Sequence, residues 1–184
     1  KKMNKLLIKD ATIINEGKRS IEDIYIEGEF IKKIGVGIKL NNEVETINAN
    51  GFLVIPGMID DQVHFREPGL THKGDISTES KAAIAGGVTS YIEMPNTIPN
   101  TTTIEEFNNK IKNASNNSFA NFSFMFGGTN DNIDEIKKID KSEVAGIKLF
   151  LGSSTGKMLI DNREAIENIF MSTSLPISAH CEDE

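Results

Sequence analysis

The chain has 184 residues, of which 38% are hydrophobic and 26% are charged, and its formal net charge is −7 at pH 7. This composition is typical of a globular protein that buries a core in one or two domains. The acidic balance, without a basic patch that carries interleaved aromatics, argues against nucleic-acid binding. No apolar run reaches the roughly 18 residues of a membrane span. Cys181 is the only cysteine, so no internal disulfide is possible and we expect a cytoplasmic protein.

Residues 1–55 predict a small β unit. Short runs rich in β-branched and aromatic residues alternate with polar turns that contain glycine. The predicted strands cover residues 6–8, 12–14, 21–26, 30–34, 44–47 and 52–55. We assign no chemistry to this unit.

From Pro56 onward, predicted strands alternate with predicted helices. The strands cover residues 58–64, 88–94, 120–126, 144–150 and 177–180. The helices cover residues 75–85, a segment that starts at a capping box of Thr103 and Glu106, a segment around 133–139, and a segment capped by residues 161–164. This alternation predicts an α/β fold with a parallel sheet.

The length of this second region leaves two architectures open. A (β/α)8 barrel needs about 250 residues, whereas 128 residues follow Pro56 (184 − 56). They supply four βα units and a fifth strand. The region is therefore either a small open α/β sheet or the front half of a barrel.

A row of polar residues marks the end of the first strand in this region. In extended backbone, alternate residues share a face, so Asp60, Gln62, His64 and Arg66 are expected to project to one side. Such a row is typical of an active site at the mouth of a parallel barrel. The alternative is an edge strand with a solvated face.

Polar residues also follow or end the later strands. Asn96 comes just after the second strand, Lys148 lies in the fourth, and His180 ends the fifth, as His64 and Arg66 end the first. The carboxyl ends of parallel strands converge on one edge, where functional residues gather in β/α folds. We therefore treat these five residues as the candidate site.

Lys148 and His180 each have two interpretations. Lys148 either extends its ammonium group to water or is buried, which lowers the pKa of the amine. A neutral amine can react with carbon dioxide to form a carbamate, whose two oxygens can bridge two metals. His180 is either a core histidine or a metal ligand, and its pairing with His64 favours ligation.

The remaining polar residues have both structural and binding interpretations. Arg66 either forms a surface salt bridge or clamps a substrate carboxylate. Asn96, between two prolines, is either a turn residue or a rigidly held hydrogen-bonding amide. His72 is expected in a solvated loop or close behind the binding residues.

At these residues the chain resembles the amidohydrolase superfamily and, within it, the dihydroorotases. The resemblance covers nearly the whole chain, and the Arg-Glu-Pro-Gly and Met-Pro-Asn-Thr blocks are its most specific parts. The matching blocks are residues 56–60 (PGMID), 64–69 (HFREPG), 85–89 (AGGVT), 93–97 (EMPNT), 146–150 (GIKLF) and 178–182 (SAHCE).

The resemblance implies a fold and an activity. Residues 1–55 would be the N-terminal part of a β-sandwich domain, and residues 56–184 the first half of a TIM-type (β/α)8 barrel of a metal-dependent hydrolase. The family hydrolyses the cyclic amide of L-dihydroorotate reversibly to N-carbamoyl-L-aspartate in de novo pyrimidine biosynthesis. The expected partner is this small molecule, with no nucleic acid and no membrane.

The resemblance also implies roles for the candidate residues. His64 would bind the more buried of one or two Zn²⁺ ions, carboxylated Lys148 would bridge the metals, and His180 would bind the second. Arg66 and Asn96 would hold the substrate carboxylate. The metals would act as Lewis acids.

Two departures from the family pattern affect these expectations. The family's His-x-His pair reads Gln62-Val63-His64, and Gln62 is a weaker zinc ligand than histidine, so one-metal and two-metal sites both stay open. The family's later histidine ligand and the aspartate that acts as general acid and base have no counterpart among residues 1–184. We expect an N-terminal fragment, inactive alone, that forms homo-oligomers or pairs with the missing C-terminal half.

Two other functions remain in competition with a dihydroorotase. An allantoinase-like cyclic amidohydrolase shares the strand lysine, but its substrate lacks the carboxylate that Arg66 would bind. A non-catalytic dihydroorotase-like subunit is suggested by Gln62, and an absence of bound zinc would favour it.

Overall fold

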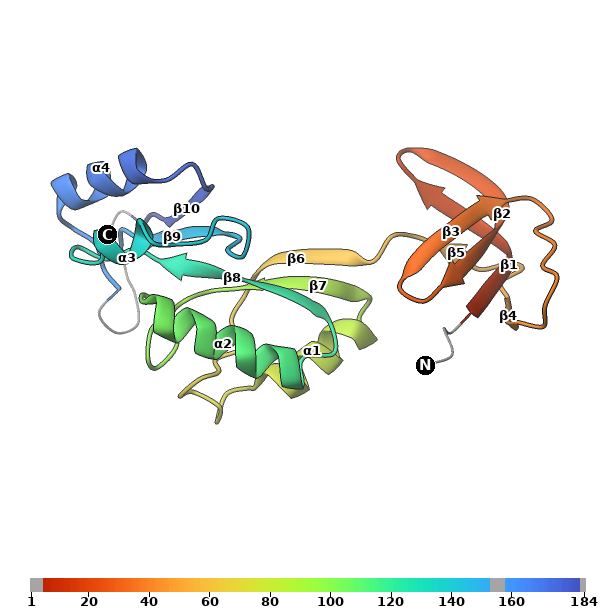
Figure 1. The fold of residues 1–184 in the computed structure, drawn as a ribbon, viewed down its shortest axis with the longest axis horizontal. Helices are drawn as coiled ribbons and strands as arrows, with labels where there is room; N and C mark the ends of the chain where they lie inside the picture. The colour runs from red at the N-terminus through yellow and green to blue at the C-terminus, as the bar shows by residue number, and fades with distance from the viewer. Residues whose placement is uncertain (1–4, 153–157, 183–184) are drawn as a thin grey trace. The chain divides into compact units, whose positions relative to one another are not determined.

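The computed structural model describes residues 5–152 and 158–182. The chain divides into two compact units, Lys1–Pro56 and Gly57–Glu184, which are taken separately below (Figure 1). In the described part of the chain, no helix is long and apolar enough to span a membrane.

The first unit is a five-stranded sheet. Its central strand β1 pairs antiparallel with β2, which pairs antiparallel with β3, whereas β4 and β5 both run parallel to β1. The predicted runs at 6–8 and 12–14 form one strand that is interrupted by a bulge between Ile8 and Ala11. The strands are β1 (Lys5–Asn15), β2 (Lys18–Glu27), β3 (Phe30–Gly35), β4 (Glu45–Asn48) and β5 (Leu53–Val54).

Local backbone conformations explain how this sheet turns and bends. Glu16 and Gly17, between β1 and β2, have positive φ angles of 49° and 72°. A two-residue hairpin turn needs positive φ at both positions so that its twist matches that of the two strands. In the bulge of β1, Asp10 has φ of 56°, and its N–H donates to Asp23 Oδ1 at 2.9 Å. The other oxygen of Asp23 accepts from the Ile38 N–H at 2.8 Å. One buried carboxylate therefore holds both the bulge and the loop after β3.

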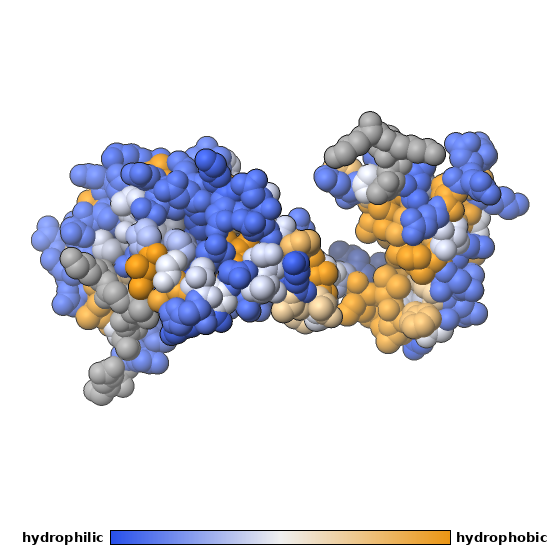
Figure 2. All heavy atoms as spheres, turned by 90° about the horizontal axis from the view of Figure 1, so that it is seen from below, coloured by the Kyte–Doolittle hydropathy of each residue, from blue (hydrophilic) through white to orange (hydrophobic). Residues whose placement is uncertain are grey.

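The first unit leaves many apolar side chains exposed. Its buried core is small and is formed by Leu7, Ala11, Ile24, Ile38 and Ala49. Part of the exposed apolar surface is visible as orange side chains on this unit in Figure 2. The large exposed residues include Ile21, Phe30, Ile31, Ile34, Val36, Phe52, Leu53 and Ile55. Apolar surface of this extent is typical of a region that contacts other protein segments.

The second unit contains five parallel strands in the order β10-β9-β8-β7-β6, so that each strand lies beside its neighbour in sequence. Helices connect successive strands, as a parallel sheet requires (Figure 1). The strands are β6 (Met58–Val63), β7 (Val88–Glu93), β8 (Asn121–Gly127), β9 (Gly146–Phe150) and β10 (Ile177–His180). The helices are α1 (Ile76–Ala85), α2 (Ile104–Asn117), α3 (Ile133–Ile136) and α4 (Arg163–Ser172).

The helices begin where the sequence predicts. Asp75 caps α1 and forms a full capping box with Thr78. Thr103 accepts a hydrogen bond from the Glu106 N–H at 3.2 Å, which is one half of the capping box predicted for α2. Asn162 caps α4 by accepting from the backbone N–H groups of Glu164 and Ala165. Satisfied N-terminal N–H groups fix where each helix starts relative to the strand before it.

The core of the second unit lies between the sheet and the helices. Phe107 of α2 packs edge-on against Phe124 of β8, with ring centroids 6.4 Å apart, and the Phe65 and Tyr91 rings lie 4.5 Å apart. Ile147 and Leu149 of β9 are fully buried in the same cluster. The side chain between them, Lys148, therefore belongs to the opposite face of the sheet.

Replacing Asp23 tests the role of its carboxylate in the first unit. In Asp23→Asn, an amide N–H₂ replaces one accepting oxygen, which should destabilise the β1–β2 region by about 1–3 kcal/mol because a buried backbone N–H loses its acceptor. Hydrogen exchange of β1 and β2 peptides, followed by mass spectrometry, measures this loss. The exposed Asp134→Asn substitution is the control and should leave the exchange unchanged.

The same carboxylate predicts a dependence on pH. The hydrogen bond from Asp10 is the main reason that the pKa of Asp23 lies below its ordinary value of 3.8 in the folded protein. The stabilisation is therefore fully present above pH 3.8 and is lost as the pH falls through the lower folded pKa. Protection of β1, corrected for intrinsic exchange, should decline over that interval in the wild type and less in Asp23→Asn. Equal acid sensitivity of the two proteins would contradict this assignment.

Candidate active site

The candidate residues come from four of the five parallel strands of the second unit. His64 follows β6, Asn96 follows β7, Lys148 lies in β9 and His180 ends β10. The structure brings the first two into direct contact and places Lys148 close enough for its charge to act on His64. His72 is exposed in the loop after β6.

The end of β6 departs from simple alternation. The strand ends at Val63, and its pairing with β7 shifts register between Asp60 and Val63. The Gln62 N–H donates to Asp60 Oδ1 at 3.1 Å, and Gln62 itself is exposed. Arg66 has a positive φ of 71°. The strand that carries the predicted row ends at Val63, and the backbone at Arg66 is not extended, so the row does not continue to Arg66.

His64 and Asn96 form the central contact. His64 Nδ1 lies 2.9 Å from Asn96 Oδ1, so with this amide orientation the imidazole donates and the amide oxygen accepts. The proton on Nδ1 leaves the Nε2 lone pair of a neutral imidazole free for a ligand. A hydrogen bond at the other ring nitrogen is the usual way in which a protein orients a metal-binding histidine.

The surroundings of His64 keep its imidazole neutral. The ring is half-buried, and desolvation is the largest cause that lowers its pKa below the usual 6.5. The charges of Arg66, Lys148 and Lys110 lower the pKa further, whereas the hydrogen bond with Asn96 raises it. A neutral imidazole is the form that binds metals.

Backbone contacts hold the loops of His64 and Asn96 together. The Met94 N–H donates to the Val63 carbonyl at 3.0 Å, and the Ile98 N–H donates to the Pro68 carbonyl at 3.1 Å. Gly69 has φ of 82°, and a Cβ at this position would lie 2.0 Å from the Ile98 carbonyl oxygen. Glycine is thus required for the two loops to approach this closely.

Lys148 is buried, and its ammonium group lies near a hydroxyl group and an aromatic ring. It is 3% exposed, its Nζ lies 3.4 Å from Ser178 Oγ, and it lies 5.4 Å from the centre of the Phe150 ring. Within residues 5–152 and 158–182, no acidic side chain lies within ion-pair distance of its ammonium. Desolvation lowers the pKa of Lys148, and nearby Cys181 opposes this shift. This excludes the interpretation as a solvated surface lysine.

His180 lies on the same face as Lys148. In the parallel register Ser178 pairs with Lys148 and His180 with Phe150, and the His180 and Phe150 rings are 6.0 Å apart. His180 Nε2 lies 3.3 Å from Glu182 Oε1, and both side chains are partly exposed. The sequence pattern alone does not mark Ser178, Cys181 or Glu182 as neighbours of the site, although they belong to the same block of residues 178–182 as His180.

The donor atoms of these side chains are of the types that bind a divalent metal ion. His64 offers a free ring nitrogen, His180 is a second imidazole, and Lys148 supplies oxygen ligands if its buried amine is carboxylated. In the described segments, no three histidine, cysteine, aspartate or glutamate side chains gather as a ready metal site. The fit therefore depends on Lys148 as the third ligand.

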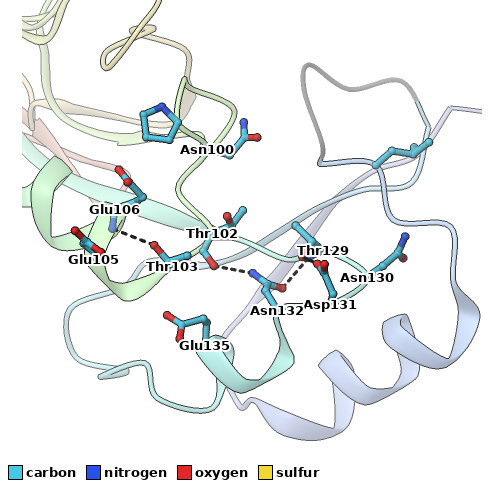
Figure 3. Close-up of a pocket in the computed structure, with 12 residues that line it drawn as sticks. Asn100, Thr102, Thr103, Glu105, Glu106, Thr129, Asn130, Asp131, Asn132 and Glu135 are labelled. Atoms are coloured by element: carbon cyan, nitrogen blue, oxygen red, sulfur yellow. Dashed lines mark hydrogen bonds between the residues drawn. The ribbon is translucent and has the colours of Figure 1, made fainter.

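A separate cavity of about 830 Å³ lies beside the loops after β7 and β8 and contains none of the candidate residues (Figure 3). The Asn132 side chain joins its two sides, because its amide donates to the Thr102 carbonyl at 2.9 Å and its oxygen accepts from the Thr129 N–H at 2.8 Å. The acidic residues that line it are Glu105, Glu106, Asp131 and Glu135.

Comparison with known proteins identifies relatives in sequence. A family model described as dihydro-orotase-like matches residues 51–154. The dihydroorotase of Methanosarcina mazei is 36% identical over 181 residues, and that of Halobacterium salinarum is 35% identical over the same length. These matches cover 96% of this chain but 39% and 41% of the two relatives, so the chain spans about two fifths of their length.

Solved structures identify the fold. L-hydantoinase (dihydropyrimidinase) from Arthrobacter aurescens superposes with a TM-score of 0.91 at 27% identity, over 99% of this chain and 41% of the hydantoinase. D-hydantoinase from a Thermus species superposes with a TM-score of 0.80 at 31% identity, over 97% of this chain and 40% of that one. The predicted fold class is confirmed: the second unit is part of a (β/α)8 barrel, preceded by a small β-sandwich segment.

Removal of the Asn96 side chain tests the contact with His64. Asn96→Ala should shift the neutral His64 away from the Nδ1–H tautomer, by roughly fivefold in the tautomer ratio for a hydrogen bond of about 1 kcal/mol. Long-range ¹H–¹⁵N spectra of the imidazole in metal-free protein measure this ratio. The exposed Asn109→Ala substitution on α2 is the control. An unchanged tautomer in Asn96→Ala would show that Asn96 does not set the orientation of His64.

Proposed function

Because this chain belongs to the dihydroorotase-like family, we propose that the complete protein is a zinc-dependent dihydroorotase. It would interconvert L-dihydroorotate and N-carbamoyl-L-aspartate in de novo pyrimidine biosynthesis. The observation that carries this proposal is the contact between His64 and Asn96 where β6 and β7 end, with Arg66 two residues beyond His64 and Lys148 buried in the same parallel sheet. This grouping combines a potential metal ligand with groups that bind a carboxylate.

Arg66 and Asn96 are the proposed substrate-binding residues. The Asn96 oxygen accepts from His64, which leaves the amide N–H₂ to donate to a substrate carboxylate. Arg66 offers a guanidinium group that binds carboxylates in a bidentate geometry. Because Asn96 is 7% exposed and bonded on one side, its amide is held in place before the substrate arrives.

His64, carboxylated Lys148 and His180 are the proposed zinc ligands, with exposed Gln62 as an additional candidate. Bound zinc would polarise the amide carbonyl and lower the pKa of water. The Lys148 amine is suited to carboxylation, because burial favours its neutral form. Its nitrogen forms a bond to the carbon of CO₂ and loses one proton, which gives a carbamate anion. The general acid and base would be an aspartate beyond residue 184.

The remaining parts of the proposal concern the domains, the substrate, the location and the assembly of the whole protein. Residues 1–55 would form the N-terminal part of a β-sandwich domain, and residues 56–184 the first half of the hydrolase barrel. The substrate would be a small molecule, and the single cysteine favours a cytoplasmic location. The exposed apolar face of the first unit favours assembly, either as a homo-oligomer or with the C-terminal half of the same barrel.

Two other functions remain as alternatives. Similarity to solved hydantoinases favours hydrolysis of some cyclic amide and also admits an allantoinase-like enzyme. The Gln62 side chain, in place of an expected histidine, favours a non-catalytic subunit. Assays of the complete protein with dihydroorotate, allantoin and hydantoin separate the two enzymes, and metal analysis identifies the subunit if no zinc binds under replete conditions.

Replacing Arg66 tests the substrate assignment. Arg66→Met in the complete enzyme should raise KM for dihydroorotate by about 10- to 100-fold, the equivalent of charge-assisted hydrogen bonds of about 1.5–3 kcal/mol. The kcat should change less, because Arg66 binds a part of the substrate that does not react. Arg163→Met removes an arginine whose side chain is 92% exposed and serves as the control. A KM that stays within twofold of wild type would count against dihydroorotate.

Carbon-13 labelling tests the proposed modification of Lys148. Protein incubated with ¹³C-bicarbonate and zinc should give a carbamate carbon signal that is absent in Lys148→Met. The matched control is Lys141→Met, which replaces an exposed lysine and should keep the signal. Zinc content, measured by atomic emission, should fall in Lys148→Met and stay at the wild-type level in the control. A bare ammonium at Lys148 in zinc-loaded protein would refute the carbamate.

A further inference from the structure

Two charged side chains lie in the core directly behind the candidate site. Glu93, the last residue of β7, is 0% exposed, and Lys110 of α2 is 2% exposed. Lys110 Nζ lies 2.6 Å from Glu93 Oε2. Neither residue belongs to the proposed metal or substrate site, so the presence of two buried charges needs another explanation.

Lys110 connects α2 to both ends of a short segment that contains Asn96. Its Nζ donates to the Met94 carbonyl at 3.1 Å and to Thr101 Oγ1 at 3.4 Å, and it lies 5.1 Å from the centre of the Phe124 ring. Thr101 is 1% exposed. One ammonium group therefore contacts the chain two residues before Asn96 and five residues after it.

Glu93 faces the loop that contains His64 and Arg66. In the parallel pairing of β6 with β7, Glu93 is the register partner of Val63, so it lies beside the residue that precedes His64. Burial raises the pKa of the Glu93 carboxyl, and the attraction of Lys110 opposes the rise. Within the described residues, neither Glu93 oxygen accepts a hydrogen bond of regular geometry, so the Lys110 ammonium is its main partner.

A buried ion pair is a poor way to stabilise a core. The cost of removing two charges from water commonly equals or exceeds their mutual attraction, and apolar residues of similar volume often replace such pairs without loss of stability. An ion pair does fix geometry, because each charge must stay close to its partner. Here Glu93 lies beside Val63, where the loop of His64 and Arg66 begins, and Lys110 bonds Met94, where the segment of Asn96 begins.

We propose that Glu93 and Lys110 are positioning residues, which hold the loops of His64, Arg66 and Asn96 in the arrangement that binds substrate. The part of this inference that concerns substrate binding rests on the proposed function. It does not require either residue to contact substrate or metal. Glu93 acts through Val63, its register partner at the end of β6, and Lys110 acts through the Met94 carbonyl and Thr101.

The test compares Glu93→Gln, Lys110→Met and the double variant Glu93→Gln/Lys110→Met in the complete protein. The double variant removes both charges of the pair together and should fold even if the single variants are unstable. Glu167→Gln is the control, because it breaks the exposed ion pair of Arg163 and Glu167. Three quantities are measured: the melting temperature, hydrogen exchange of peptides that cover residues 64–69 and 94–98, and steady-state kinetics with dihydroorotate at saturating zinc.

In the double variant we expect a melting temperature close to that of wild type, at least tenfold faster exchange in the two loop peptides, and a KM raised at least tenfold. A purely structural pair would change the melting temperature and leave the loop exchange and KM of the folded double variant at wild-type values. That result would overturn the proposal. If wild type does not turn over dihydroorotate, the proposed function fails, and loop exchange alone then decides whether the pair positions these loops.

Discussion

Parallel pairing of β6 to β10 places the carboxyl ends of five strands at one edge of the sheet. One face of the sheet packs against the helices, and the other carries residues of the candidate site. In β9, Ile147 and Leu149 pack into the helix-side core, so Lys148 and Phe150 must face the other way. A shift of β9 by one residue would turn Ile147 and Leu149 out of the core and turn Lys148 into it. The position of the candidate site therefore depends on the same register that builds the core.

Much of this arrangement could be predicted, because it depends on local periodicity. The strands and helices of the second unit, their caps, and the placement of His64, Asn96, Lys148 and His180 near strand ends all follow from short patterns. The first unit was harder to predict. Its β4 and β5 pair parallel to β1, and this pairing depends on contacts between residues more than 35 positions apart, such as Leu6 with Glu45 (45 − 6 = 39). The bulge of β1 depends on Asp23, a partner in another strand.

The Glu93–Lys110 pair shows a second reason why sequence analysis is incomplete. Lys110 lies on the apolar face of α2 with Phe107 and Ala114, where the pattern of Ile104, Phe107 and Ile111 predicts only a buried stripe. A lysine at such a position usually extends its charged end to water. Its burial is explained by Glu93, which ends a strand 17 residues earlier (110 − 93), and by the Met94 carbonyl beside it. Each residue alone is a weak signal, and only the three-dimensional contact joins them.

The candidate site contains two cationic side chains, although the formal net charge of the chain is −7. Glu93 offsets the charge of Lys110, whereas Arg66 and Lys148 form no ion pair in the described part of the chain. Both of these cations lower the pKa of His64, so their fields act on the same small region. A carbamate on Lys148 would remove one positive charge and add a negative one, and Arg66 would remain as the cation for a substrate carboxylate.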